Sequence, residues 1–187
     1  MSAQSIYTML RQAGMTHAGA CGMLGNMDCE SNVEPYRLQG DFTGDRIKSW
    51  VYVNDVDLGN MSREKFANDS KGYGLCQWTF HSRKAALYDY AKACGVSIAD
   101  EEMQVKFAIR ELQKDFPELW TLLCTTDSMQ KASDGICKKF ENPAAGELWV
   151  PSPMIIPFAP PKKIGVPEPI ASKFGSFGRG DKHPAPE

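Results

Sequence analysis

Apolar residues recur at helical spacing along most of the chain before residue 141, and this pattern predicts a mostly helical domain. Thr16, Ser62 and Asp100 stand where helix N-caps are expected, while Gly14 and Gly95 follow periodic stretches and mark helix ends. Helices are therefore predicted over residues 5–12, 17–30, 63–67, 82–94, 101–116, 118–124 and 128–140.

Two stretches depart from this pattern. Residues 47–53 (IKSWVYV) are rich in β-branched and aromatic side chains, which predicts a strand, and Asn54–Asp55 then predict a turn. From Pro143 onward the composition changes, because all but two of the twelve prolines lie there. We expect an α+β, mostly helical domain over residues 1–143, with a small β element. A proline-rich, extended tail over residues 144–187 is expected to wrap on this domain or to link it to another protein.

Composition and charge exclude several classes of function. The chain has 187 residues, of which 42% are hydrophobic and 24% charged, as expected for one globular domain with an appendage. A formal net charge of −2 gives no basic surface for nucleic acid, and no cationic surface that would hold the protein on an anionic cell wall. No stretch approaches the about 18 apolar residues of a membrane span, so no membrane partner is expected.

Cysteine usage points to a reducing environment. The first seven residues lack the basic region and apolar run of a signal peptide, so the six cysteines are expected to be reduced thiols; three disulfides are the alternative. No two cysteines form a CxxC pair and the three histidines are scattered, so we expect neither a zinc site nor a cofactor. The cysteines are Cys21, Cys29, Cys76, Cys94, Cys124 and Cys137.

The helix that begins after Thr16 carries a glutamate at its end. Met23, Met27 and Glu30 share one stripe of this helix, so the carboxyl group continues an apolar face. A carboxyl group set against apolar side chains holds its proton more tightly, which suits a general acid. A plain surface glutamate is the alternative. The adjacent face is formed by small residues that allow another backbone to come close, namely Ala18, Cys21, Gly22, Gly25 and Cys29.

Glu30–Ser31, answered by the run from Gly72 to Thr79 (GYGLCQWT), resembles the lysozyme-like superfamily of cell-wall glycosidases. With Asn68–Lys71, Arg83–Lys84 and the later run from Phe140 to Pro143 (FENP), the pattern over residues 5–143 resembles the phage tail lysozyme family. The resemblance implies a lysozyme-like fold in which the small β element forms one wall of the cleft.

This resemblance also implies a function. The expected activity is that of a muramidase, which cleaves the β-1,4 bond between N-acetylmuramic acid and N-acetylglucosamine in peptidoglycan, with Glu30 as general acid. Peptidoglycan is the expected partner, together with other phage tail proteins. The chain is expected to be made in the host cytoplasm without a signal peptide. It would leave the cell by lysis, through a holin, or by assembly into the phage tail, where it would degrade the wall locally.

A second carboxylate could activate water, and several aspartates are candidates. Asp69 is preferred because goose-type lysozymes, which this region resembles, place an aspartate shortly before the same glycine-rich run. Asp57 is the second choice, and either could instead fix a loop through an Asx-turn. Some goose-type enzymes carry another aspartate where Thr79 stands here, and this departure leaves open the lytic-transglycosylase route, in which a hydroxyl of the substrate attacks. The remaining candidates are Asp41, Asp45 and Asp55.

Further residues are expected to bind the glycan. Gly74 and Gln77 would supply backbone and amide hydrogen bonds, with glycine letting the backbone approach the sugar. Tyr73 and Trp78 would present flat ring faces to sugars, or else belong to the packed core. The predicted substrate-binding set is Ser31, which holds either the helix end or the N-acetyl group, with Tyr73, Gly74, Gln77, Trp78, Thr79 and Asn142.

Two readings from other classes remain open. A cysteine peptidase would need a thiol nucleophile with a histidine base, and Cys76 and His81 are the available pair. A catalytically silent component of the tail that only binds the wall is the other alternative.

Overall fold

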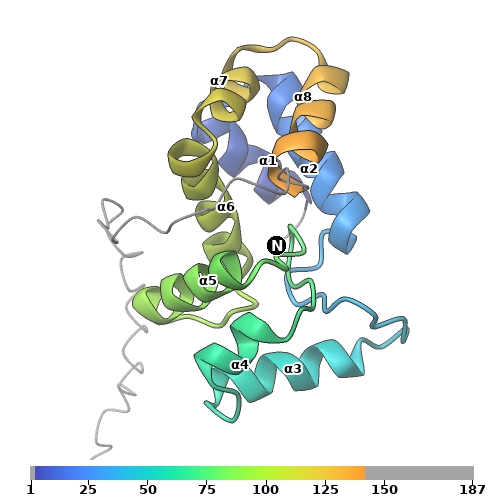
Figure 1. Cartoon of the computed structure of the whole chain (residues 1–187). Helices are drawn as coiled ribbons and strands as arrows, with labels where there is room; N and C mark the ends of the chain where they lie inside the picture. Colours follow the sequence, from blue (N-terminus) through green and yellow to red (C-terminus); the bar gives the residue numbers. More distant parts are fainter. Residues whose placement is uncertain (1–2, 142–187) are drawn as a thin grey trace, which may run out of the picture. The chain divides into compact units, whose positions relative to one another are not determined.

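The computed structural model describes residues 3–141, which belong to the first of two units into which the chain divides, Met1–Ile156 and Pro157–Glu187. Eight α-helices and one π-helical turn, η1, make up most of the described part (Figure 1). The predicted boundary at residue 143 and the tail lie outside it. The elements are α1 (Ala3–Gln12), α2 (His17–Ser31), α3 (Ile47–Asp57), α4 (Arg63–Asn68), α5 (His81–Cys94), α6 (Glu101–Asp115), α7 (Pro117–Thr125), α8 (Met129–Ile136) and η1 (Cys137–Glu141).

Helix α2 is tied into the fold at its first residue. The hydroxyl of Thr16 accepts a hydrogen bond from the amide of Gly19 at 2.9 Å, which confirms the predicted cap, and donates one to the carbonyl of Thr126 at 2.6 Å. A side chain at Gly19 would lie 2.0 Å from the carbonyl oxygen of Leu123, and one at Gly22 would lie 2.6 Å from Ala132. The predicted close approach is thus confirmed at Gly22, where α8 packs against α2.

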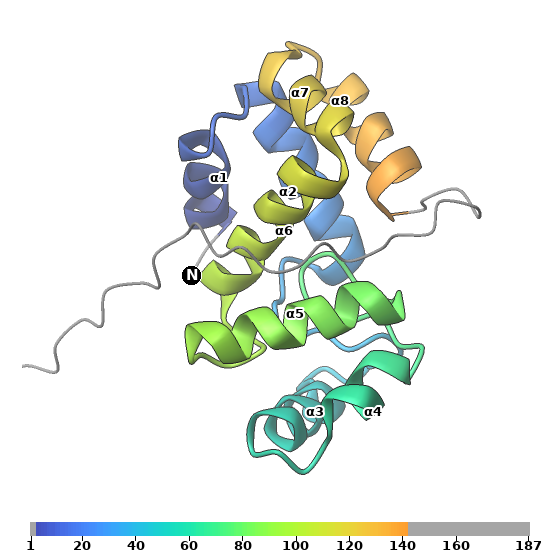
Figure 2. The ribbon, with the colours of Figure 1, turned by 60° about the vertical axis from the view of Figure 1, so that its left-hand side comes forward.

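The helices form two groups. Helix α2 contacts α1, α7 and α8, while α6 contacts α1, α5 and α7, and α4 packs on α5. Figures 1 and 2 both place α3 and α4 at the opposite end of this region from α7 and α8. The connections over residues 32–46 and 69–80 lie together, because the amide of Gly74 donates to the carbonyl of Arg37 at 2.8 Å and the amide of Gln39 donates to that of Gly72 at 2.9 Å.

The predicted strand over residues 47–53 is wrong. This stretch begins α3, and the predicted turn at Asn54–Asp55 lies inside the same helix. Tertiary packing overrides the β-propensity of the side chains, because the buried positions follow a helical period. Those positions are Ser49, Tyr52, Val53 and Val56.

No β-strand occurs in residues 3–141, so the small β element is not found there. Two isolated β-bridges, Leu38 with Tyr73 and Tyr73 with Trp78, are the extended pairing that these residues show. The described part is therefore mostly helical, which is consistent with a lysozyme-like helical fold.

The other predicted helices are confirmed, with ends shifted by a few residues. Ser62 and Asp100 cap α4 and α6 through their side chains, and Gly95 ends α5 in the left-handed conformation. None of the helices in residues 3–141 is both long enough and apolar enough to cross a membrane. All six cysteines lie in this part and are free thiols.

Candidate active site

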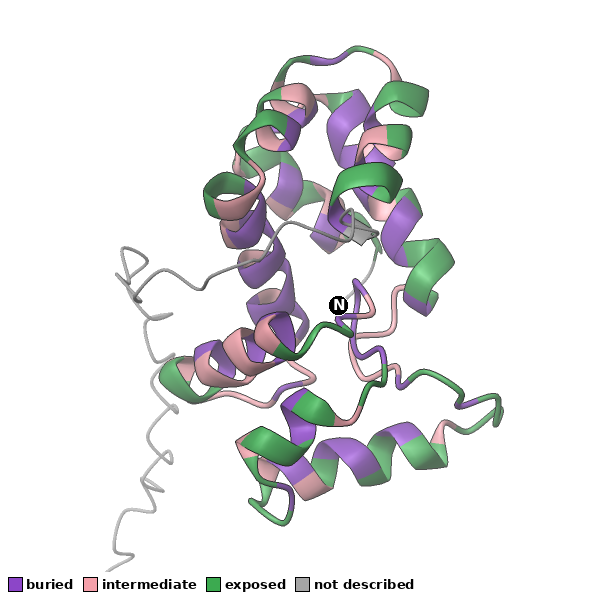
Figure 3. Cartoon of the chain, in the orientation of Figure 1, coloured by how far each residue is buried: buried purple, intermediate pink, exposed green. Residues whose placement is uncertain are grey.

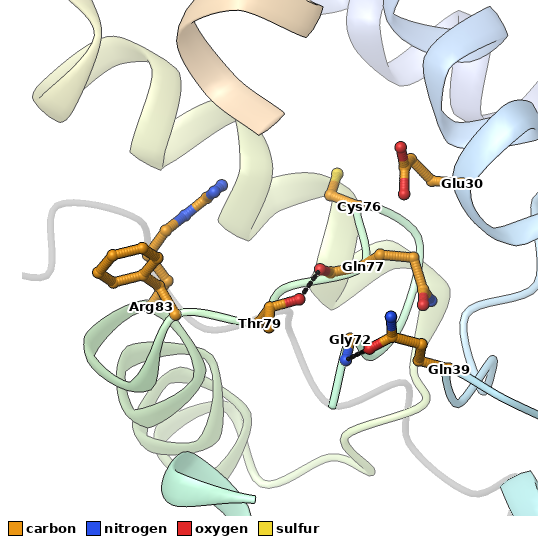
Figure 4. A pocket seen from close by; sticks show the side chains of 8 residues that line it. Glu30, Gln39, Gly72, Cys76, Gln77, Thr79 and Arg83 are labelled. Atoms are coloured by element: carbon orange, nitrogen blue, oxygen red, sulfur yellow. Dashed lines mark hydrogen bonds between the residues drawn. The ribbon is translucent and has the colours of Figure 1, made fainter. Parts of the chain in front are cut away.

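A pocket of about 180 Å³ lies where α2 and α5 meet the two long connections. Figure 4 shows Glu30 on one side of it and Arg83 on the other, with Cys76 and Gln77 between them. Most of the wall comes from the stretch 72–80, which contains the predicted glycine-rich run. The lining residues are Glu30, Gln39, Gly72, Cys76, Gln77, Thr79, Phe80 and Arg83.

Glu30 projects from the last turn of α2. Asn32 and Val33 then adopt the left-handed conformation, with φ of 57° each, and turn the chain away from the helix axis. The predicted apolar surroundings of the carboxyl group are absent, because Glu30 is exposed, whereas Met23 and Met27 on the same stripe are buried. Among the residues that line the described pocket, Glu30 carries the only carboxyl group. Its position allows it to exchange a proton with a molecule seated there.

The glycine-rich run forms a tight loop. The backbone amide and carbonyl groups of Tyr73 pair with those of Trp78, at 3.2 and 3.0 Å, and the amide of Gln77 donates to the carbonyl of Gly74. Gln77 has a φ of +45°, which is uncommon for a residue with a side chain. Its amide nitrogen donates to the carbonyls of Gly74 and Arg37, at 3.0 and 3.2 Å, so the side chain holds the loop as well as lining the pocket.

Gln104 on α6 fixes this loop from below, and the sequence analysis missed it. Its side-chain oxygen accepts from the amide of Leu75 at 2.8 Å, while its nitrogen donates to the carbonyls of Pro35 and Ile98, at 2.7 and 2.6 Å. Gly74, with φ of +75°, lies so close that a side chain there would come within 2.6 Å of the Gln104 oxygen. A buried glutamine inside an apolar helical stripe was the signal that could have drawn attention to it.

Arg83 connects the pocket to the end of the described chain. Its guanidinium donates to both carboxylate oxygens of Glu111, at 2.9 and 3.0 Å, and to the carbonyl of Phe140 at 2.8 Å. The ring of Phe140 lies 4.3 Å from the guanidinium carbon. Trp78 donates its indole N–H to the same Glu111 carboxylate at 2.7 Å. One buried acid thus joins the glycine-rich loop, α5 and η1; Glu111 was not identified from the sequence.

Asp69 does not line the pocket. Its carboxylate accepts hydrogen bonds from the Tyr52 hydroxyl, from the Lys84 ammonium and, at 3.0 Å, from the amide of Lys71. Lys84 is fully buried and also donates to the carbonyl of Lys71 at 2.9 Å and to the Tyr52 hydroxyl at 3.1 Å. Burial lowers the pKa of Lys84, against the opposing influence of Asp69. The arrangement matches the loop-fixing alternative for Asp69, including its Asx-turn.

The other candidate aspartates also lie outside the lining. Asp57 accepts from the hydroxyl of Ser97 at 2.5 Å and from the amide of Ile98 at 3.1 Å, and so fixes the start of the α5–α6 connection. Asp41 is fully buried and accepts from Thr43 and from the hydroxyl and amide of Ser49. The hydrogen bond from Thr43, and then those from Ser49, hold the pKa of Asp41 well below its usual value against the effect of burial. Asp45 and Asp55 complete the set.

The predicted glycan-binding residues fall into two groups. Gln77 and Thr79 line the pocket, where the hydroxyl of Thr79 donates to the carbonyl of Gln77 at 2.9 Å. The side chains of Tyr73 and Trp78 are fully buried, as in the core alternative. Ser31 is buried and donates to the carbonyls of Met27 and Leu75, so it holds the helix end. Asn142 lies outside the described residues.

Phe80 is an exposed aromatic residue in the pocket lining that sequence reasoning passed over. It stands directly after Thr79 at the N-cap position of α5 and is 59% exposed. Its place beside the quoted motif was the available signal. In this structure it offers the ring face that Tyr73 and Trp78, both buried, do not.

No cluster that could bind a metal ion was found in the described residues: nowhere do three or more His, Cys, Asp or Glu side chains come together for that purpose. The chemistry that this pocket offers is therefore that of a carboxyl group beside amide, hydroxyl and aromatic side chains.

Comparisons with known proteins complete the description. No solved structure matches the chain at a significant level. The model of one protein family, described as phage tail lysozyme, matches residues 1–154. This span is more than four-fifths of the chain and contains the whole pocket lining. The chain therefore belongs to the phage tail lysozyme family.

Proposed function

We propose that the chain is a muramidase-type glycosidase that cleaves the β-1,4 bond between N-acetylmuramic acid and N-acetylglucosamine, with Glu30 as general acid. This is a specific form of the lysozyme-like, peptidoglycan-degrading function that the family suggests. One observation carries the proposal: the exposed carboxyl of Glu30 is the only carboxyl group in the lining of the pocket that the described residues form.

In the proposed reaction, the carboxylic acid of Glu30 gives its proton to the oxygen of the leaving sugar while positive charge develops at the other sugar carbon. Gln77 and Thr79 would hydrogen-bond the glycan at the pocket floor, and Gly72 and Gly74 would let it approach the backbone. Phe80 would stack its exposed ring on a sugar face. This role replaces the one predicted for Tyr73 and Trp78.

Two routes can complete the reaction. In hydrolysis a base activates water, and Asp69 stays the predicted candidate. To serve, its carboxylate would have to share or exchange the bonds that Tyr52, Lys84 and Lys71 now donate. In the lytic-transglycosylase route a hydroxyl of the substrate attacks instead, leaving an anhydro sugar. The presence of a single carboxyl group in the described lining favours this second candidate.

Mass spectrometry of fragments released from purified peptidoglycan tests the proposal, comparing the wild type with Glu30→Gln. Fragments that disappear in the variant are expected, since the amide cannot donate a proton as an acid does. Reducing N-acetylmuramic acid ends would mean hydrolysis, and anhydro-muramic ends would mean transglycosylation. Equal release by both proteins would overturn the role of Glu30.

The same assay addresses the other classes. A cysteine peptidase using Cys76 and His81 would release peptides and lose activity on thiol alkylation. A silent binding component would sediment with the wall but release nothing. The family places the chain among phage-associated proteins. We further propose that it acts as part of the phage tail, opening the wall locally, and that other tail proteins are its partners.

A further inference from the structure

Exposed apolar side chains gather around the start of α3. Figure 3 shows buried and exposed residues alternating along this helix, and the outward positions include large hydrophobic side chains. Apolar groups collected on a surface usually mark a binding site, whereas isolated ones do not. They are Phe42, Ile47, Trp50 and Val51, with exposed fractions of 87%, 57%, 46% and 53%.

Trp50 is held rigidly within this group. Its ring stacks on that of Tyr36, with centroids 4.4 Å apart and planes inclined by 23°. Tyr36 is itself half-buried, so the stack is anchored to the fold. A ring whose orientation is fixed before binding loses little freedom when a ligand covers it.

The ring pair adjoins the pocket through the chain itself. Tyr36 directly precedes Arg37, whose carbonyl accepts from the amide of Gly74 and from the side chain of Gln77. Two residues further on, the side-chain oxygen of Gln39 accepts from the amide of Gly72 at 2.8 Å, and Gln39 lines the pocket. The segment from Tyr36 to Gln39 therefore has the aromatic pair at one end and the pocket wall at the other.

The pocket is too small for the proposed substrate. Its volume of about 180 Å³ is below the about 300–1,000 Å³ that encloses a drug-sized ligand, whereas a peptidoglycan strand is a polymer of sugars. Most of a bound strand must therefore run over the surface beside the pocket. An exposed, rigid aromatic ring there suits the apolar C–H face of a sugar ring.

We propose that Tyr36 and Trp50 form a saccharide subsite outside the pocket, where the Trp50 ring stacks on a sugar of the strand whose neighbouring unit is held beside Glu30. This inference rests on the proposed function. A protein partner fits less well, because exposed Lys48 and Asn54 interrupt the outward face of α3. A stable protein interface needs a broader surface, about 800 Å² on each side.

Glycan length gives the decisive test. Trp50→Ala, Trp50→Phe, Phe80→Ala and Met129→Ala are compared on long glycan strands and on peptidoglycan fragments of one repeating disaccharide. Met129 is a matched control, since it is 56% exposed and lies on α8. Binding is also measured by sedimentation with purified peptidoglycan, each substitution being combined with Glu30→Gln to prevent cleavage.

Trp50→Ala is expected to raise KM and the dissociation constant for long strands about three- to tenfold, with kcat nearly unchanged. It should leave the disaccharide fragment unaffected. Trp50→Phe should restore most of the binding, and Phe80→Ala should weaken binding at both lengths. Wild-type behaviour of Trp50→Ala on long strands would overturn the inference while leaving the role of Glu30 intact. So would a change of oligomeric state, which would identify this face as a protein interface.

The two proposals can fail separately. If the wild type binds strands without cleaving them, the proposed function fails, and sedimentation still measures whether Trp50 contacts the glycan. If Trp50→Ala is unfolded by circular dichroism, the comparison of Trp50→Phe with wild type on long strands replaces it. A smaller ring should then give a KM raised only for long strands, and equal KM values would overturn the inference.

Discussion

Arg83 and Glu111 form a doubly hydrogen-bonded ion pair whose side chains are only 8% and 3% exposed. The same carboxylate accepts the indole N–H of Trp78, and the same guanidinium donates to the carbonyl of Phe140. Burying two charges is costly, and the pair is held together by these additional bonds. Its position indicates that it keeps the glycine-rich loop, α5 and η1 in register around the pocket, with the charge of Arg83 already neutralised.

We therefore expect Glu111→Ala to lower the free energy of unfolding by about 3–5 kcal/mol, because it leaves the Arg83 charge buried and unpaired. Urea unfolding followed by circular dichroism measures this. Glu118→Ala is the matched control: Glu118 also pairs with a base, Lys139, but is 84% exposed, and should cost no more than about 1 kcal/mol. Equal losses in the two variants would show that burial of the first pair is energetically irrelevant.

Gly74→Ala should damage both stability and activity. With φ at +75°, an alanine at this position is strained, and its side chain would meet the Gln104 amide at 2.6 Å. Gln104 cannot yield without giving up its own bonds to Leu75, Pro35 and Ile98.

Gly40→Ala separates the two causes. Gly40 has nearly the same φ, +79°, but a side chain there would meet nothing within 4 Å. The backbone strain alone should cost about 1–2 kcal/mol in this variant, and activity on peptidoglycan should persist. A Gly74→Ala protein that unfolds and cleaves like Gly40→Ala would mean that the contact with Gln104 imposes nothing on the loop.

The helices and their caps could be predicted from the sequence because each rests on neighbouring residues. Thr16, Ser62 and Asp100 stand directly before apolar-periodic stretches, and a side-chain cap requires only the next turn of chain. Helix α3 was predicted as a strand for the same reason. Local composition there is that of a strand, and only packing against distant residues such as Phe66 and Tyr73 makes the helical stripe decisive.

The candidate site was predictable as far as it is continuous in sequence. Glu30, Gln77 and Thr79 belong to recognisable runs, and all three line one pocket. Gln104 and Glu111 escaped attention because their partners lie about thirty residues away, and a polar residue in a helical stripe has no local mark of its role. Tyr73 and Trp78 share the run with Gln77, yet the alternation of side-chain direction in the loop sends their rings into the core.

Asp41 should make stability depend on pH. Its pKa is held below the usual value of about 3.9, chiefly by the hydrogen bond from Thr43, so the folded protein favours the ionised form. The stability it contributes is present above that usual pKa and is lost as the pH falls below it. Urea unfolding of wild type and Asp41→Asn should therefore differ most at pH 6–7 and converge below about pH 4. A gap that stays constant down to pH 3 would show that the charge of Asp41 is not what stabilises the fold.

Asp69→Asn is expected to reduce stability far more than catalysis. The substitution removes the counter-charge of Lys84, whose side chain is fully buried, while the pocket lining keeps every residue it had. Loss of a general base costs about 10²–10⁴-fold in rate, so a fall in kcat of less than tenfold, measured where the variant is still folded, would exclude Asp69 as the base. Asp57→Asn is the control, since Asp57 is likewise bonded to a loop and outside the lining. A fall of 10²-fold or more in Asp69→Asn alone, with reducing ends among the wild-type products, would mean that the carboxylate leaves Lys84 to activate water. Because the ion pair would have to open for that reaction, the activity of the wild type should then rise in Tyr52→Phe, which frees one oxygen of Asp69 without removing its charge.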